Sequence, residues 1–83
     1  MRFTVVYDPD EQNRLIDLWM QAQDQDAFSA AVNQIDRLLG TMLEQCGRPA
    51  GLLRILEVSP VAVLYHVSPD DCMVRVIAVR TVP

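Results

Sequence analysis

The sequence contains no lysine: its seven basic residues are all arginine, against eleven aspartates and glutamates, which gives a formal net charge of −4. Because affinity for nucleic-acid phosphates comes mainly from Lys and Arg, this balance argues against a general nucleic-acid binder. The charges are also unevenly distributed. Most carboxylates precede residue 45, whereas Arg54, Arg75 and Arg80 lie in the last part of the chain. We therefore expect a locally basic sheet beside acidic helices.

The chain is equally poor in residues that build covalent or metal frameworks. Its two cysteines, Cys46 and Cys72, have no CxxC spacing, and His66 is the only histidine. We interpret the cysteines as reduced thiols of a cytoplasmic protein and expect no cofactor and no metal site. No basic and apolar leader precedes the first strand, and no apolar run approaches the ~18 residues of a membrane span. We therefore expect no signal peptide and no membrane partner.

What the chain has in quantity is apolar side chains, which make up 51% of its 83 residues. This fraction suits a packed core, and the length suits one domain over residues 1–83. A core of this size is marginal, worth only about 3–5 kcal/mol on its own. A tightly bound partner or a homodimer would therefore stabilise the protein.

Hydrophobic spacing predicts a strand, two helices and three closing strands. This order, β-α-α-β-β-β, predicts an α+β fold in which a helical hairpin packs on one face of an antiparallel-rich sheet. The strands are expected at Arg2–Tyr7, Leu52–Val58, Val61–Ser68 and Met73–Val82.

The start of each helix carries its own signals. Asp8 can cap the first helix, Pro9 suits its first position, and Glu11 completes a capping box. Asp24 and Asp26 are cap candidates for the second helix. Gly40 could end that helix, or it could continue to Gln45 with Gly47 as its cap, and residues 47–51 read as a loop. The buried faces are expected to comprise Leu15, Leu18, Trp19 and Ala22 in the first helix, and Phe28, Ala31, Val32, Ile35, Leu38, Leu39 and Met42 in the second.

The last two strands can be paired by their turn. If Asp70 and Asp71 form the tip, His66 lies opposite Arg75. Alternation then predicts an apolar face under the helices and a mixed, uncovered face. The first face would hold Val61, Val63, Tyr65, Val67, Val74, Val76 and Ala78, and the second Ala62, Leu64, His66, Ser68, Met73, Arg75, Ile77 and Val79.

The preceding hairpin has two possible registers. A loop of three residues, 59–61, places Arg54 opposite His66, so that Arg54, His66 and Arg75 form a row across the uncovered face. A loop of two residues turns Arg54 to the helix side instead. We favour the row, because Arg is costly to bury beneath the helices. The same choice places Glu57 on the helix side, near a rim.

Besides the order of its elements, the sequence contains several segments that are informative together. These are Asp36-Arg37-Leu38-Leu39, Arg54-Ile55-Leu56-Glu57-Val58, and Val63-Leu64-Tyr65-His66-Val67-Ser68-Pro69-Asp70-Asp71 leading into Val74-Arg75-Val76-Ile77-Ala78-Val79. Together they resemble the RelE/ParE superfamily of bacterial type II toxins over essentially the whole chain. None of the strings is a sharp motif, and the likeness rests on their order and spacing.

The resemblance implies a small toxin held inactive by a cognate antitoxin. RelE-type members cut messenger RNA on the ribosome with basic groups of the sheet, and ParE-type members inhibit DNA gyrase. Here Ala62 stands at the position of a sheet arginine, Val82 falls near that of a basic residue, and no tyrosine follows it. These departures favour ParE-like inhibition, or a relative without toxicity, over ribonuclease activity.

Two sets of site residues follow as hypotheses. For RNA cleavage, His66 would act as the base while Arg54 and Arg75 hold the phosphate. The alternative is a surface imidazole, with arginines that pair with acidic residues of an antitoxin. The uncovered face also carries apolar side chains, which an antitoxin segment or a second copy would cover. This predicted partner-binding set comprises Leu56, Ala62, Leu64, Ile77, Val79 and Arg80.

Overall fold

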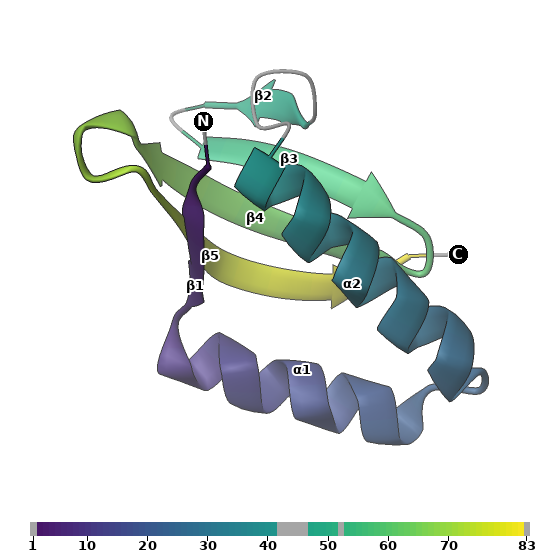
Figure 1. Ribbon diagram of the computed structural model, residues 1–83. Helices are drawn as coiled ribbons and strands as arrows, with labels where there is room; N and C mark the ends of the chain where they lie inside the picture. The colour runs from purple at the N-terminus through teal and green to yellow at the C-terminus, as the bar shows by residue number, and fades with distance from the viewer. Residues whose placement is uncertain (1, 42–46, 52, 83) are drawn as a thin grey trace.

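The computed structural model describes residues 2–41, 47–51 and 53–82. Its elements follow the chain in the order β1, α1, α2, β2, β3, β4, β5 (Figure 1). The predicted α+β class and the order of the predicted elements are confirmed, and one strand is added. The bounds are β1 Thr4–Tyr7, α1 Pro9–Gln21, α2 Gln25–Thr41, β2 Arg48–Ala50, β3 Leu53–Val58, β4 Val61–Ser68 and β5 Met73–Thr81.

The five strands form one sheet in the order β1-β5-β4-β3-β2. Strand β1 runs parallel to β5, and every other neighbouring pair is antiparallel. The pairing of β1 extends only from Thr4 opposite Met73 to Tyr7 opposite Val76. Among the described residues, therefore, no strand pairs with the outer side of the second half of β5.

The added strand β2 corrects our prediction that residues 47–51 form a loop. Arg48 pairs with Ile55, and Pro49 lies opposite Arg54, at an edge of the sheet where a missing N–H is tolerated. Gly47 precedes the strand with a positive φ of 77°. A Cβ at Gly47 would also collide with the Tyr65 hydroxyl, so both backbone and space require glycine here.

Helix α1 begins where the sequence predicts, but without the predicted capping box. Asp8 is the N-cap and Pro9 the first helical residue, yet the Asp8 side chain makes no capping hydrogen bond. Its backbone carbonyl instead accepts the N–H groups of Glu11 and Gln12, each at 2.9 Å. The Glu11 side chain is buried and turned toward β5, where it binds a backbone N–H.

Helix α2 is capped as expected by Asp24, whose Oδ1 accepts the backbone N–H of Ala27 at 2.9 Å. The helix runs past Gly40 to Thr41, so Gly40 does not end it. Met42 and the predicted continuation to Gln45 lie outside the described residues. Neither α1 nor the described part of α2 is long and apolar enough to cross a membrane.

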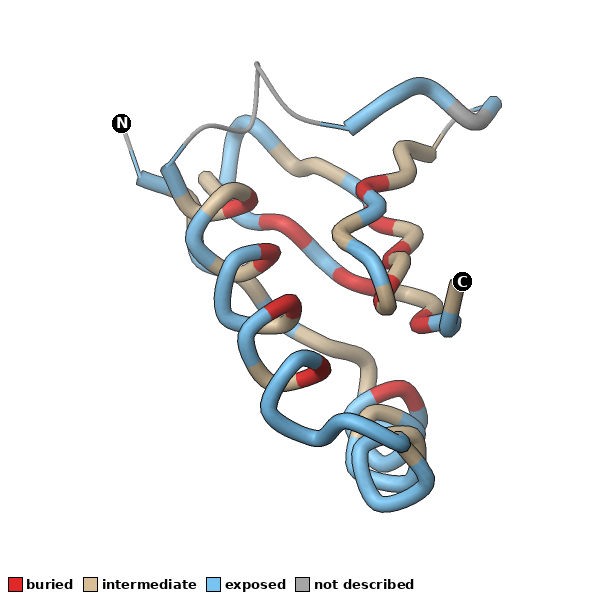
Figure 2. The backbone as a smooth tube through the Cα atoms, turned by 90° about the vertical axis from the view of Figure 1, so that its right-hand side faces the viewer, coloured by how far each residue is buried: buried red, intermediate tan, exposed pale blue. Residues whose placement is uncertain are grey.

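The core lies between α2 and one face of the sheet. Buried positions of α2 all face the strands in Figure 2, and the described helix buries Phe28, Ala31, Ile35 and Leu39. The sheet contributes Leu56, Val61, Val63, Tyr65, Val74, Val76 and Val79. At one end of the sheet, the Tyr7 hydroxyl donates a hydrogen bond of 2.7 Å to Asp36 Oδ1 and ties β1 to α2. Burial, reinforced by this hydrogen bond, raises the pKa of Tyr7.

A β-bulge changes the predicted faces of β5. His66 lies opposite Arg75 as expected, and Tyr65 opposite Val76, but Leu64 pairs with Ala78 and leaves Ile77 as the extra residue. An extra residue reverses the alternation beyond it. Val79, expected on the uncovered face, is therefore fully buried in the core, and Ala78 takes the uncovered side.

Two isoleucines allow a matched test of this core. Ile35 is fully buried, whereas Ile16 is 53% exposed on the other helix. Replacing Ile35 by Val should lower the free energy of unfolding by about 0.5–1.5 kcal/mol, because it removes one packed methylene. Ile16→Val should change it by less than about 0.5 kcal/mol. Urea titrations followed by circular dichroism measure both, and equal losses would contradict the assigned core.

Candidate functional site

The face of the sheet opposite the helices is partly exposed. We call it the open face. It has an apolar centre, where Leu64 lies between Ile55 of β3 and Ala78 of β5, and none of the three is fully buried. The other described members are Thr4, Val6, Arg48, Leu53, Glu57, Ala62, His66, Ser68, Met73, Arg75, Ile77 and Arg80. The predicted one-sided covering of the sheet is thus confirmed.

The register of the β3–β4 hairpin contradicts the predicted row of basic residues. Val58 pairs with Val61 across the two-residue turn Ser59–Pro60, which places Arg54 opposite Tyr65 on the helix side. Arg54 is only partly buried there, and its Nη2 donates to the Gly47 carbonyl, 3.5 Å away, while its buried Nε has no hydrogen-bond partner among the described residues. The strand β2, absent from our sequence prediction, brings this acceptor into reach.

The same register moves two further residues. Leu56, predicted to bind a partner, pairs with Val63 and is 7% exposed within the core. Glu57, placed on the helix side by the favoured register, instead lies opposite Ala62 on the open face. Its Oε2 is 3.9 Å from Arg48 Nη2. The apolar centre of the open face therefore contains Ile55 in place of Leu56, and Ala78 in place of Val79.

His66 and Arg75 are neighbours on the open face, as the turn predicted, and both are exposed. Although the Arg75 side chain is 65% exposed, its Nε lies 2.7 Å from Asp8 Oδ1. Asp8, which we expected to act only as a helix cap, thus neutralises one arginine of the proposed phosphate site. Exposed pairs of this kind contribute little stability but lower the local positive potential.

Arg80 and Glu11 both bind the backbone of Val79, in the half of β5 that does not pair with β1. Glu11 Oε1 accepts the Val79 N–H at 2.9 Å, and Arg80 Nη1 donates to the Val79 carbonyl at 2.8 Å. Arg80 Nη1 also lies 3.7 Å from Glu11 Oε1, and Arg14 Nε lies 3.3 Å from Glu11 Oε2. The Val79 N–H bond, assisted by the two arginines, lowers the pKa of Glu11 despite its burial. Helical spacing gave no signal for this role of Glu11.

The open-face arginines share one property. Arg48, Arg75 and Arg80 each lie within 4 Å of a carboxylate of the same chain. A surface that binds phosphate through counterion release needs cations that are not already paired.

In the part of the chain that the structure describes, no three His, Cys, Asp or Glu side chains gather closely enough to hold a metal ion.

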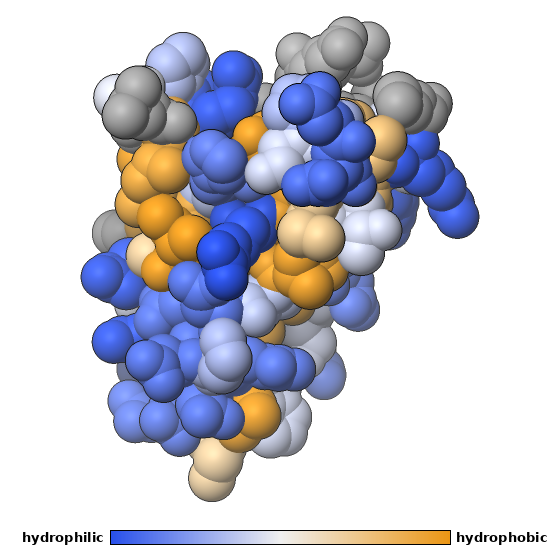
Figure 3. Space-filling view, turned by 90° about the vertical axis from the view of Figure 1, so that its left-hand side faces the viewer, coloured by the Kyte–Doolittle hydropathy of each residue, from blue (hydrophilic) through white to orange (hydrophobic). Residues whose placement is uncertain are grey.

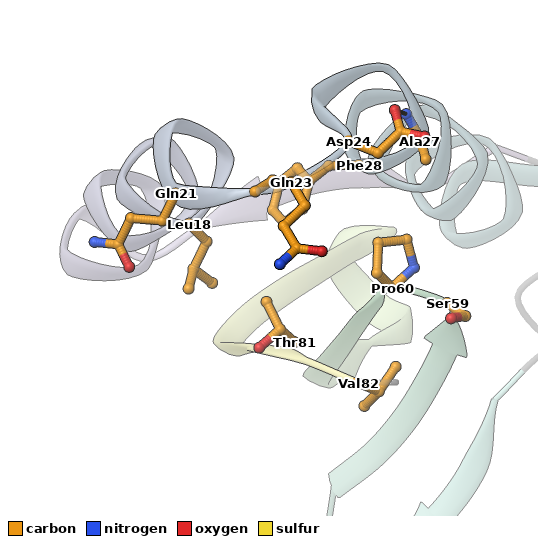
Figure 4. Close-up of a pocket in the computed structure, with 11 residues that line it drawn as sticks. Leu18, Gln21, Gln23, Asp24, Ala27, Phe28, Ser59, Pro60, Thr81 and Val82 are labelled. Atoms are coloured by element: carbon orange, nitrogen blue, oxygen red, sulfur yellow. Dashed lines mark hydrogen bonds between the residues drawn. The ribbon is translucent and has the colours of Figure 1, made fainter.

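Hydrophobic side chains gather over the strands when the molecule is viewed from the β4–β5 turn, whereas the surface near the start of α1 is largely hydrophilic (Figure 3). A separate cleft of about 640 Å³ lies between the helix joint and the end of β5. In Figure 4, Gln23 points from this joint toward Thr81 and Pro60, and Leu18 and Phe28 of the two helices also line the cleft. None of the predicted site residues lines this cleft.

Comparison with solved structures places the fold. The chain superimposes on a protein from the RelBE2 toxin–antitoxin complex of Mycobacterium tuberculosis with a TM-score of 0.80, at 15% sequence identity, covering 98% of this chain and 92% of that one. The chain has a RelE-like fold. A chain of the chromosomal ParDE toxin–antitoxin system of P. aeruginosa matches with a TM-score of 0.63, at 15% identity, covering 99% of this chain and 98% of that one. No protein-family model and no curated protein matches the sequence.

On this RelE-like fold, the predicted site residues divide into two groups. His66, Arg75, Ala62, Leu64, Ile77 and Arg80 lie on or beside the open face, whereas Arg54, Leu56 and Val79 lie on the helix side. The geometry therefore assembles a surface of mixed apolar and polar side chains on the open face. It does not bring Arg54 together with His66 and Arg75. The catalytic and partner-binding roles stay predictions.

The buried Glu11 carboxylate predicts a specific dependence of stability on pH. Because its pKa is lowered from an ordinary value of 4.5 in the folded state, its contribution is complete above that value and is lost as pH falls through the lower folded value. Glu11→Ala should cost about 1–3 kcal/mol near pH 7, since the Val79 N–H loses its partner.

Glu11→Gln provides the matched control, because an amide oxygen can still accept the Val79 N–H but does not titrate. Free energies of unfolding measured from pH 7 to pH 3 should show the difference between the native protein and this variant shrinking at low pH. An exposed carboxylate in the same turn gives the reference variant Asp10→Asn. If the native protein and Glu11→Gln follow parallel curves, folding does not lower the pKa of Glu11.

Proposed function

We propose that this protein is the toxin, or a toxin-like relative, of a cytoplasmic type II toxin–antitoxin module. It acts by binding a protein target in the manner of ParE and is neutralised by a cognate antitoxin. The support is the RelE-like fold, since both matched structures come from toxin–antitoxin systems. DNA gyrase is the target class that the resemblance to ParE implies.

The composition of the open face and the pairing of its arginines support protein binding over RNA cleavage. Its centre is formed by partly exposed aliphatic residues, Ile55, Leu64 and Ala78, which a monomer seldom leaves uncovered over a large area. The surrounding arginines are paired with carboxylates of the chain. An apolar centre with a paired, polar rim is the composition of a protein interface.

Ribosome-dependent cleavage of messenger RNA is the second candidate, because His66 lies beside Arg75. A general base needs the phosphate held within its reach. Arg54 is on the opposite face, and Arg75 is occupied by Asp8. The geometry therefore favours this candidate less than protein binding.

Inducible expression in a bacterial host tests the proposal. The native protein should slow growth, and co-expression of a short reading frame adjacent to its gene should restore it. Leu64→Asp places a charge at the centre of the open face and should relieve the growth defect, because a buried unpaired charge opposes docking. Gln34→Asp adds the same charge at an exposed helix position and should remain toxic.

Two controls separate a loss of binding from a loss of folding. Thermal unfolding shows whether Leu64→Asp is folded, and Ala62→Gln gives a second, uncharged obstruction on the same face.

Two assays distinguish the mechanisms. A gyrase supercoiling assay should show inhibition, while primer extension on cellular transcripts should show that the transcripts stay intact. Cleavage that His66→Ala abolishes would instead establish the ribonuclease, and unimpaired growth at high expression would refute toxicity.

A further inference from the structure

The outer edge of β1 carries backbone groups that no described residue binds. Strand β1 lies at one end of the sheet and, among the described strands, pairs with β5 alone (Figure 1). The N–H groups of Thr4 and Asp8 each donate to a carbonyl on the β5 side, so alternate residues of β1 turn their backbone groups toward β5. The residues between them turn theirs outward. Val5 and Tyr7 therefore present N–H and C=O groups to a position that a further strand would occupy.

The other edges of the described sheet are protected against such pairing. Beyond β1, Glu11 and Arg80 bind the backbone of Val79 on the outer side of β5. At the opposite end of the sheet, β2 has only three residues, and its central residue, Pro49, has no N–H. Short edge strands, prolines and charged side chains are the means by which proteins keep foreign strands from pairing. The four residues of β1 have neither a proline nor a side chain bound across their outer edge.

This edge borders a hollow of about 400 Å³ between β1 and the end of α2. The lining comprises Arg2, Phe3, Val5 and Tyr7 on one side and Asp36, Arg37, Gly40 and Thr41 on the other. The helix closes the start of the edge, because the Gly40 carbonyl accepts the Phe3 N–H at 2.9 Å. A segment in the hollow would therefore meet the backbone of Val5 and Tyr7, with α2 beside it.

The charged groups of the hollow indicate what kind of segment it would accept. Three charged side chains line it, those of Arg2, Asp36 and Arg37. Asp36 already accepts the hydrogen bond of the Tyr7 hydroxyl at 2.7 Å. Among the described residues, neither Arg2 nor Arg37 has a carboxylate within 4 Å, in contrast to the four arginines whose ion pairs are described above. The hollow is thus net positive on a chain with a net charge of −4, and carboxylates complement it.

We propose that the outer edge of β1 binds an extended, acidic segment of a partner protein, which adds to the sheet as a further strand. The backbone of the segment would pair with Val5 and Tyr7, and its carboxylates would meet Arg2 and Arg37. The inference goes beyond the proposed function, because it uses a surface other than the open face and holds whether or not the protein is toxic.

Two other occupants fit the edge less well. A nucleic acid would be attracted by the arginines, but it lacks the regularly spaced donors and acceptors that strand pairing needs. Two copies that paired through β1 about a two-fold axis at Val5 would use the Phe3 N–H of each copy, and Gly40 already binds that N–H. An unrelated strand is not bound by this symmetry and can end before Phe3.

An eight-residue synthetic peptide, in which Val and Thr alternate with Glu, is the probe. In the NMR spectrum of the ¹⁵N-labelled protein, titration with this peptide should shift the Val5 and Tyr7 amide signals saturably and slow their exchange with solvent. A twin peptide with Lys in place of Glu should bind about tenfold more weakly or worse, because it opposes the two arginines. A second twin, N-methylated at every residue, keeps the carboxylates but has no backbone donor, and it should not bind.

Two matched variants locate the binding. Arg37→Gln should weaken the Glu peptide about threefold, since it removes one cation of the hollow. Arg14→Gln makes the same change at an exposed arginine of α1 outside the hollow and should leave the affinity unchanged. Circular dichroism checks that both variants are folded. The proposal is overturned by equal binding of the Glu and Lys peptides, by binding of the N-methylated twin, by equal losses in both variants, or by unshifted Val5 and Tyr7 signals at about millimolar peptide.

Self-association is measured with the protein alone. Light scattering and the Val5 and Tyr7 amide signals should not change with protein concentration. Dimer formation that protects the Val5 amide from exchange without any peptide would show that a second copy occupies the edge. That result would overturn the proposed acidic partner.

Discussion

The carboxylate of Glu11 occupies the place where a neighbouring strand would supply a carbonyl oxygen. Strand β1 covers only Met73–Val76 of β5, and the Val79 N–H beyond it points away from β4 toward α1. A buried N–H without an acceptor would cost free energy comparable to a lost hydrogen bond. One side chain from the first turn of α1 removes that cost and holds the helix against the sheet.

This contact depends on three features that must occur together. Helix α1 has to begin directly after β1, so that its first turn reaches β5. The bulge at Ile77 has to reverse the alternation, so that the Val79 side chain enters the core while its N–H faces outward. Arg14 and Arg80 have to lie near the carboxylate, so that its charge is compensated. With Arg80 bound to the Val79 carbonyl, this part of the edge is unavailable for pairing with another strand.

Periodicity and turn chemistry predicted the parts of this fold that depend on neighbours in sequence. The strand β4 was predicted with its observed bounds, and the acidic turn after it gave the correct pairing of His66 with Arg75. The bulge at Ile77, the two-residue turn before β4 and the edge strand β2 depend on tertiary packing, which local pattern does not contain. Glu11 shows the same limit: the capping-box pattern assigns its carboxylate to the helix, but a buried N–H at Val79 competes for the same oxygen.

The position of Arg54 bears on whether this RelE-like fold can cleave RNA, because cleavage needs basic groups on one face of the sheet. A shift of one residue in the β3–β4 hairpin removes its guanidinium from the face that holds His66 and Arg75. Phosphodiester cleavage needs positive charge on the same side as the base, because charge develops on the phosphate oxygens in the transition state. Here the remaining arginines of that face are compensated by carboxylates of the same chain. The scaffold is shared with the matched structures, and a shared fold does not fix the chemistry of its surface. In this chain the open face carries apolar side chains and paired charges, a composition that is also found in protein interfaces.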